Sequence, residues 1–550
     1  MNIFDERPVL IVDDSQIYRT SAARMLTKLG LPNSQIVLSA DSKQALSACR
    51  RNQFQLVLID YNLGTQANGY QLLDDIKSQQ LLPPDCVVVV ITGDASADIV
   101  KSFAELEPDS YLIKPLSFNT LKERVPKLLE QKRALSSILW AIKDTDYDNG
   151  LEACEEVMFD CGDTRKHAAL LKVQILLLKG DMDSARNLLV SLNSTISTDV
   201  FSAKLAEIAI AKRQYSMAEY VLTSHLKRSP ESAKELTLLG ELYLLTGKVT
   251  LAQEAIINAI SLSPTVVKRH WLLLCCYLIN QQHTEAIKCV NEVIHHSLYS
   301  SRHSLTAYQL GASIVVDSAM KCDFDKREAA IRELKGYLEQ WRKRFNSREY
   351  KPFELLVMAR AYFAVGLRGK GLSLLEEYKQ LKERVESNPL EIVEMIKISH
   401  QVGGIGSLES LIVQFDQSIG DLATDTHAVF PESMRGYLAI WRTEFNSALE
   451  HYQSQKRRVM IATESGQYEV AAELLVDMFY AGVELTLDVP RRLLHTLSKA
   501  WPSGMCRIQV VKVATKCKES LIGADNFPTD RESQILATLA RQLDYPELNR

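Results

Sequence analysis

Residues 8–14 read PVLIVDD, a short apolar run that ends on two aspartates. Three later runs also end on polar residues: LVLID at 56–60, VVVVIT at 87–92 and SYLIKP at 110–115. Each run is largely continuous in its apolar residues rather than alternating, which is typical of strands buried on both faces. The first 130 or so residues therefore contain the inner strands of a sheet that is covered on both sides.

Helical patterns separate these runs along the chain. The predicted strands are Pro8–Val12, Gln35–Leu38, Leu56–Ile59, Val87–Ile91 and Ser110–Ile113. The predicted helices are a stretch ending at Leu29, then Ser42–Arg51, Tyr70–Ser78, Ser96–Leu106 and Ser117–Gln131. Strands that alternate with helices in this way predict an α/β domain with a five-stranded parallel sheet. Ligands of such sheets bind outside the carboxyl ends of the strands.

Polar side chains at four of these strand ends form one chemical group. Asp13, Asp14 and Asp60 are expected to converge, and a divalent cation would relieve their repulsion. Oxygen ligands suit a hard ion, so we expect Mg²⁺. The Lys114 ammonium and the Thr92 hydroxyl complete the pocket. This set suits phosphoryl transfer, in which a carboxylate attacks phosphorus to form an acyl phosphate and cations offset the charge on the oxygens.

Any one of these residues alone would be an ordinary polar loop end, and only their combination and order argue for a site. In that combination the chain resembles the response-regulator receiver family over Arg7–Gln131, which implies a flavodoxin-like receiver domain at residues 1–131. The resemblance implies that Asp60 is the phosphoacceptor and that Asp14 binds the metal directly. It also implies that Asp13 acts through water.

The same resemblance gives roles to further residues. Asn62 would offer its backbone carbonyl to Mg²⁺, and Thr92 and Lys114 would be the switch hydroxyl and the phosphate-binding lysine. The peptide bond between Lys114 and Pro115 is expected to be cis. Tyr111 matches the aromatic position that turns inward on phosphorylation, although simple packing is an equally weighted alternative.

Two polar residues flank the expected path of water to an acyl phosphate. Asn62 and Asp94 could position that water, so we predict a phosphoryl lifetime of minutes rather than hours. Comparing phosphoryl decay in the natural chain and in Asn62→Ala would test this, and equal half-lives would contradict it.

Beyond about residue 132, strand patterns give way to helical spacing, and an internal repeat of 34 residues appears. Ala218, Ala252 and Ala286 recur at one position, where a small side chain lets two helices approach closely. Pro230 and Pro264 recur where a second helix would end. The pattern resembles the tetratricopeptide repeat (TPR) and predicts an all-α superhelix.

The repeat divides the rest of the chain. We assign 132–165 to a linker and first helical hairpin, 166–524 to TPR-like repeats that are clearest at 199–298, and 525–550 to a capping helix or tail. Weaker copies are expected around Gly436–Tyr452 and Gly466–Leu475. The segments His303–Ser347 and Asn388–Phe430 fit the period poorly: the first is expected to hold longer helices, and the second to interrupt the stack.

Composition excludes several other classes of protein. The formal net charge of -4 gives no general attraction to nucleic acid. The sequence shows no secretory signal pattern and no apolar run long enough for a membrane span. None of the ten cysteines forms a CxxC pair, which favours reduced thiols in a cytoplasmic protein. The basic run Trp341–Arg344 could contact nucleic acid, but such a run is more often a solvated helix face.

We therefore expect a response regulator that takes its phosphoryl group from a sensor histidine kinase. No catalytic output motif is present, so the chain is expected not to be an enzyme beyond its own phosphotransfer and autodephosphorylation. The output would be a protein partner bound by the repeats, and the architecture is similar to that of VieB-type auxiliary regulators, which suggests modulation of a phosphorelay. The alternative is a transcription regulator whose repeats bind DNA or an activator.

Signal exit and self-association are expected on the last elements of the first domain. The helix Ser117–Gln131 leads directly into the repeats and would pass the signal on. A homodimer could form through Ser96–Leu106 and Ser110–Gln131, and the sequence does not decide between pairing and docking on the repeats.

Overall fold

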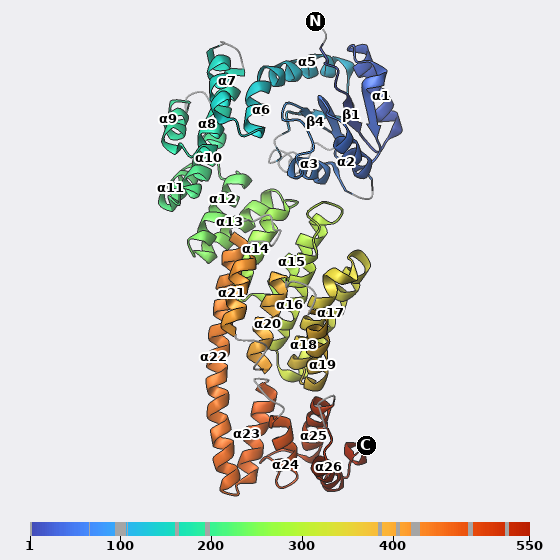
Figure 1. Ribbon diagram of the computed structural model, residues 1–550, viewed down its shortest axis with the longest axis vertical. Helices are drawn as coiled ribbons and strands as arrows, with labels where there is room; N and C mark the ends of the chain where they lie inside the picture. The colour runs from blue at the N-terminus through green and yellow to red at the C-terminus, as the bar shows by residue number, and fades with distance from the viewer. Residues whose placement is uncertain are drawn as a thin grey trace. The chain divides into compact units, whose positions relative to one another are not determined.

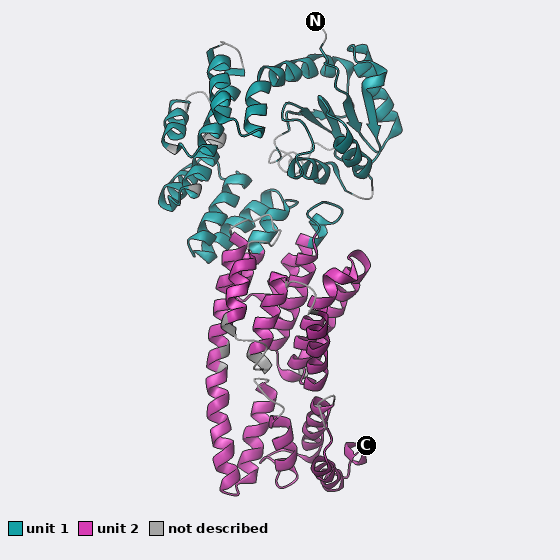
Figure 2. Ribbon diagram, in the orientation of Figure 1, with its two compact units in different colours: residues 1–273, 294–303 teal, residues 274–293, 304–550 magenta. Residues whose placement is uncertain are grey.

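The structure is a computed structural model (Figure 1). It describes residues 3–64, 67–93, 106, 108–159, 164–192, 198–382, 388–402, 408–419, 429–481, 488–522 and 527–549. The chain divides into two compact units, which Figure 2 shows in different colours. Unit 1 comprises Met1–Leu273 with Ile294–His303, and unit 2 comprises Leu274–Val293 with Ser304–Arg550.

Unit 1 begins with the predicted five-stranded parallel sheet. Its strands are β1 (Val9–Val12), β2 (Ile36–Ser39), β3 (Leu56–Asp60), β4 (Val87–Thr92) and β5 (Ser110–Ile113). Their spatial order is β2-β1-β3-β4-β5, and every neighbouring pair is parallel. This is the flavodoxin-like order, in which the switch point between β1 and β3 marks the ligand-binding edge.

Helices cover both faces of this sheet. They are α1 (Gln16–Lys28), α2 (Ser42–Arg51), α3 (Gly69–Ser78) and α5 (Phe118–Ala134). Alternate strand residues point to opposite faces. Leu10, Val57 and Ile59 therefore pack with α2 and α3, whereas Ile11 and Leu58 pack with α1 and α5. The predicted helix at Ser96–Leu106 falls outside the described residues, except for Leu106.

The helical part of unit 1 starts without a break in helical structure, since α5 leads almost directly into α6. Its helices are α6 (Ser136–Lys143), α7 (Tyr147–Phe159), α8 (Thr164–Leu178), α9 (Met182–Leu192), α10 (Thr198–Ala211), α11 (Tyr215–Leu226), α12 (Ala233–Leu245) and α13 (Val249–Leu262). Consecutive helices pack as hairpins. Ala218 and Ala252 are fully buried, and a methyl group on Gly240 would lie 2.4 Å from the side chain of Ile256. Small residues thus set the helix spacing, as the 34-residue period predicts.

Two helices, α14 (Val267–Ile279) and α15 (His283–Ser297), run from one unit into the other. The remaining helices belong to unit 2. They are α16 (Leu305–Met320), α17 (Phe324–Arg344), α18 (Ser347–Ala364), α19 (Arg368–Lys382), α20 (Pro389–Val402), α21 (Leu408–Ser418), α22 (Val429–Glu464), α23 (Tyr468–Ala481), α24 (Asp488–Leu497), α25 (Arg507–Leu521) and α26 (Asp530–Gln542). None of the helices described is long and apolar enough to cross a membrane.

The longer helices expected at His303–Ser347 are present as α16 and α17, which have 16 and 21 residues. The prediction of a repeat copy around Gly436–Tyr452 was wrong. That segment lies inside α22, which is continuous over 36 residues and contains no turn there. The turn comes instead at Gly466, whose φ of +74° suits a glycine at a helix end.

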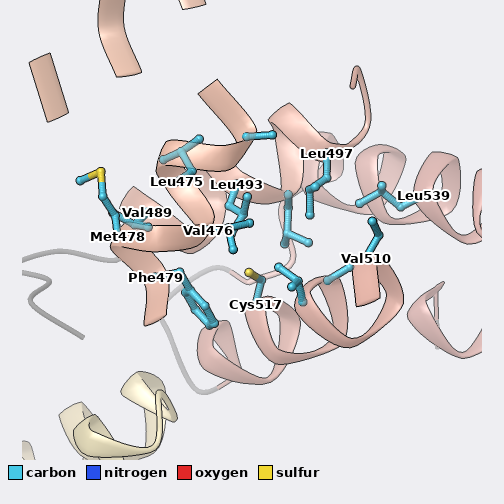
Figure 3. Packing of buried hydrophobic residues seen from close by; sticks show 14 of the residues in the cluster. Leu475, Val476, Met478, Phe479, Val489, Leu493, Leu497, Val510, Cys517 and Leu539 are labelled. Carbon is cyan, nitrogen blue, oxygen red and sulfur yellow. The ribbon is translucent and has the colours of Figure 1, made fainter. Parts of the chain in front are cut away.

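The end of unit 2 has its own apolar core (Figure 3). Side chains of α23, α24, α25 and α26 meet there, including Leu475, Leu493, Val510 and Leu539, which are all at most 1% exposed. The predicted terminal helix within 525–550 is present as α26, and Leu539 anchors it in this core.

Candidate functional site

The carboxyl ends of four strands bring together the predicted site residues. Asp13 and Asp14 follow β1, whereas Asp60 and Thr92 are the last residues of β3 and β4. Lys114 follows β5, and its backbone N–H donates to the carbonyl of Thr92 at 2.8 Å. Because all five strands are parallel, these ends lie on one edge of the sheet.

The three acids form a compact group with one cation. Single carboxylate oxygens of Asp13, Asp14 and Asp60 all lie within 4.8 Å of one another. The Lys114 ammonium lies 2.7 Å from Asp13 and 2.9 Å from Asp60. Asp13 and Asp60 are buried, whereas Asp14 is exposed and open to incoming ligands. The group therefore has a dry floor and an accessible rim.

Burial and charge determine the protonation of this group. Desolvation raises the pKa of Asp60 to about 6; Lys114 opposes this rise, and the neighbouring Asp13 and Asp14 add to it. Burial alone would lower the pKa of Lys114, but its hydrogen bonds to Asp13 and Asp60 raise it above the usual value. At neutral pH the site therefore holds a charged lysine beside a carboxylate that is mostly ionised.

The donor set fits a hard divalent cation. Three carboxylates offer oxygen ligands only, which suits Mg²⁺ better than zinc or copper. Lys114 supplies one positive charge against three negative ones, so the group keeps an excess of negative charge that a divalent ion would offset.

Comparisons with known proteins agree with this geometry. The family model described as "Response regulator receiver domain" matches residues 9–126. Chemotaxis protein CheY-3 of Vibrio cholerae is 32% identical over 124 residues, which are 22% of this chain and 92% of that protein. Sensor histidine kinase RcsC of Salmonella typhimurium is 32% identical over 129 residues, which are 24% of this chain and 13% of that protein.

This chain carries a response-regulator receiver domain. It is thus a member of the two-component systems, in which the phosphodonor of a receiver domain is a histidine kinase. Among solved structures, a CheY-like receiver domain protein of Methanospirillum hungatei JF-1 is 25% identical and covers 24% of this chain and 98% of that one, with a TM-score of 0.21.

The other predicted receiver residues fall into three groups. The peptide bond between Lys114 and Pro115 is cis, as predicted. Asn62 is exposed in the loop after β3, where its role stays a prediction, and Asp94 lies outside the described residues. Tyr111 is half-buried against the core on the α2–α3 face of the sheet, and this burial raises the pKa of its hydroxyl.

Two features of the receiver site were not predicted. The Lys114 ammonium lies 4.3 Å from the centre of the Tyr18 ring, a cation–π contact that steadies the lysine. Tyr18 stands four residues after Asp14, so the helical spacing from the acidic pair was the available signal. The second feature is Gly69, where an added methyl group would lie 2.1 Å from the carbonyl oxygen of Asp60.

The basic run at Trp341–Arg344 packs within unit 2. Trp341 is fully buried, and its indole N–H donates to Glu354 at 3.0 Å. Arg342 donates to both carboxylate oxygens of Glu354, at 3.0 and 2.8 Å. The aromatic ring that could have stacked on a base is therefore part of the protein core, which favours the structural interpretation of this run.

Proposed function

We propose that the chain is a response regulator that accepts a phosphoryl group on Asp60 from a histidine kinase and acts through proteins bound by its helical repeats. The observation that supports this most strongly is the group formed by Asp13, Asp14, Asp60 and Lys114, with its distances of 2.7 and 2.9 Å from the lysine to two carboxylates.

The transfer step follows from the residues of the site. An oxygen of the Asp60 carboxylate attacks the phosphorus of a phosphohistidine, the phosphorus–nitrogen bond breaks, and an acyl phosphate forms. The Lys114 ammonium, now shared between Asp13 and Asp60, can pair with the phosphoryl oxygens. The Thr92 hydroxyl, at the end of the neighbouring strand, can donate a hydrogen bond to the bound group.

Mg²⁺ would be held by the carboxylates of Asp13, Asp14 and Asp60 and, by the family resemblance, by the carbonyl of Asn62. When bound, it would offset charge on the phosphoryl oxygens. The receiver is proposed to catalyse its own phosphotransfer and autodephosphorylation and no other reaction.

The output proposal is supported by the all-helical hairpins that follow the receiver. Their closely packed positions, Ala218, Ala252 and Gly240, recur at the 34-residue period or face its partner helix. Stacked helical hairpins of this kind present an extended surface to proteins or peptides. We propose that TPR-type repeats here modulate a signalling partner in a phosphorelay, in the manner suggested for VieB-type regulators.

Incubation of the full chain with acetyl phosphate and Mg²⁺, followed by electrophoresis in a phosphate-retarding gel, tests the first part. We expect a retarded band that hydroxylamine removes and that Asp60→Asn does not form. Asp183→Asn, an exposed aspartate far along the chain, is the matched control and should be phosphorylated normally. A retarded band of equal strength in Asp60→Asn would contradict the assignment.

Co-purification of the chain with the histidine kinase of its own organism tests the second part. The comparison is between the natural chain, Asp60→Asn and a chain truncated after residue 134. Kinase captured equally by all three would show that the repeats add nothing to partner binding, and would contradict the output proposal.

A further inference from the structure

The receiver makes a polar contact with a segment of the repeats that lies more than 200 residues away in sequence. We name it the α3–repeat contact: Gln71, Asp74 and Asp75 on α3 meet residues 296–302, where α15 ends and the chain turns toward α16. Both sides belong to unit 1. The three α3 residues are spaced at i, i+3 and i+4, which places them on one face of the helix.

Charge and hydrogen bonding are matched across the contact. Arg302 forms a two-pronged ion pair with Asp74, in which its Nη2 donates to Oδ1 at 2.7 Å and its Nε donates to Oδ2. Asp75 accepts from the backbone N–H of Ser301 at 2.7 Å and from the Ser301 hydroxyl at 2.6 Å. Two-pronged arginine–carboxylate pairs are among the stronger and more directional polar contacts in proteins.

Burial shows that this is a built interface rather than a surface encounter. Asp74 and Asp75 are 9% and 2% exposed, which is unusual for two adjacent acids on the outer face of a helix. Desolvation raises the pKa of Asp75, while the two bonds from Ser301 oppose the rise. Val266, in the turn before α14, adds an apolar contact by packing against the receiver core.

Gln71 connects this contact to the start of α3. Its side-chain oxygen accepts from the backbone N–H of Asn68 at 3.0 Å, and its own N–H donates to the Asn68 side chain at 2.9 Å. The side-chain NH₂ of Gln71 donates to the carbonyls of His296 and Leu298, at 2.8 and 3.2 Å. One side chain thus caps the N-terminus of α3 and satisfies carbonyls at the C-terminus of α15, which would otherwise lack partners.

The start of α3 is in turn fixed to the phosphorylation site. The Gly69 N–H donates to the carbonyl of Tyr61 at 2.7 Å, and Gly69 approaches the backbone of Asp60 too closely for any side chain. Asp60 here pairs with Lys114, the arrangement of an unmodified aspartate. A phosphoryl group on Asp60 adds bulk and about two negative charges beside the loop that holds Gly69. That loop and the first turn of α3 cannot both stay in place.

We propose that α3 is the exit for the signal: in the unphosphorylated chain its face of Gln71, Asp74 and Asp75 binds residues 296–302 of the repeats, and phosphorylation of Asp60 releases them. This inference rests on the proposed phosphorylation of Asp60. It differs from the expectation that the signal leaves through the last receiver helix alone. The released partner surface is the segment 296–302, which a second protein can then contact.

Linkage provides the test, because a contact that phosphorylation weakens must itself oppose phosphorylation. The probe is beryllofluoride with Mg²⁺, a stable mimic of the phosphoryl group, titrated into the full chain. Arg302→Glu places a repelling charge against Asp74 and should raise the affinity for beryllofluoride by about fivefold or more. The exchanged pair Asp74→Arg with Arg302→Glu should return the affinity toward that of the natural chain.

Arg435→Glu is the matched control, since Arg435 is paired with Asp416 at 2.7 Å within unit 2. It should leave the affinity unchanged. Hydrogen exchange of the Ser301 amide, which donates to Asp75, reports the contact directly. We expect this amide to exchange faster in Arg302→Glu, and faster in the natural chain once beryllofluoride is bound.

Two results would overturn the inference. Equal Ser301 exchange in the natural chain and in Arg302→Glu, without beryllofluoride, would show that the contact does not hold the segment. An unchanged or lower beryllofluoride affinity in Arg302→Glu would show that the contact is not coupled to Asp60 in the proposed direction. A natural chain that binds no beryllofluoride would instead refute the proposed function, and release by phosphorylation with it.

Discussion

The close approach of α3 to the phosphoacceptor strand makes Gly69→Ala a severe test of the receiver structure. The added Cβ would lie 2.1 Å from the carbonyl oxygen of Asp60 and 2.9 Å from the Cα of Tyr61. Both neighbours are backbone atoms, so no side chain can rotate away. An ordinary contact of at least 3.4 Å is out of reach unless the start of α3 retreats from β3.

The expected cost has two parts. Overpacking in a tight region costs about 1–3 kcal/mol. A retreat of α3 also breaks the hydrogen bond of 2.7 Å from Gly69 to Tyr61, which is worth about 1 kcal/mol. We therefore expect the free energy of unfolding of the receiver to fall by about 2–4 kcal/mol, which lowers its urea midpoint by roughly 1–2 M.

Hydrogen exchange of peptides from β3 and β4, measured across a urea series, isolates the receiver from the helical units. Gly336→Ala is the control: it lies inside α17 with no atom within 4 Å of the added methyl group. Replacing a helical glycine with alanine should stabilise α17 by about 0.5–1 kcal/mol and leave the receiver unchanged. If Gly69→Ala shifts the β3 and β4 transition by no more than this control does, the proposed fixation of α3 to Asp60 is wrong.

Three further predictions concern unit 2 and its thiols. Arg360 is fully buried between Asp317 and Glu394, so Arg360→Met should destabilise unit 2 by about 3–5 kcal/mol in a urea series read by exchange of α16 and α20, whereas Arg435→Met should cost less than about 1 kcal/mol. Burial alone would raise the pKa of Asp317, but Arg360 and Lys397 hold it well below its usual value, so stability from this carboxylate is complete above about pH 5 and is lost as the pH falls further; a urea midpoint for unit 2 that is equal at pH 7 and pH 3 would contradict this. Burial raises the pKa of the Cys275 thiol to about 12, so an aromatic disulfide reagent at pH 8 should label the exposed Cys506 in the folded chain and Cys275 only after denaturation, as peptide mapping would show.

The receiver fold and its acidic site were open to prediction because both follow from local patterns. Each strand is one apolar run, and the bounds of Ser110–Ile113 and Ser42–Arg51 agree with the structure residue for residue. A parallel sheet then brings its carboxyl ends to one edge whatever the details of the loops. Asp13, Asp60 and Lys114 therefore converge as a consequence of topology.

The errors arose where a local pattern has two physical outcomes. Gly436 resembled a turn, but a glycine inside a helix costs only about 1 kcal/mol, and the packing of α22 outweighs that cost. The run at Trp341–Arg344 resembled a basic surface, yet Glu354 on the next helix draws both Trp341 and Arg342 into the structure. Neither outcome is visible without the neighbouring helix.

The contact between receiver and repeats was beyond sequence reasoning for a different reason. Asp74 and Asp75 look like solvated helix residues, because their partners lie 226 to 228 positions away. The repeat period nevertheless explains why the contact exists. Val266 lies in the turn after α13, and residues 298–302 lie in the turn after α15, one period later. Successive second helices of a helical-repeat array end on the same edge, so two consecutive turns can meet one receiver. The 34-residue period that builds the array thus also sets the spacing of the two points at which the array holds the receiver.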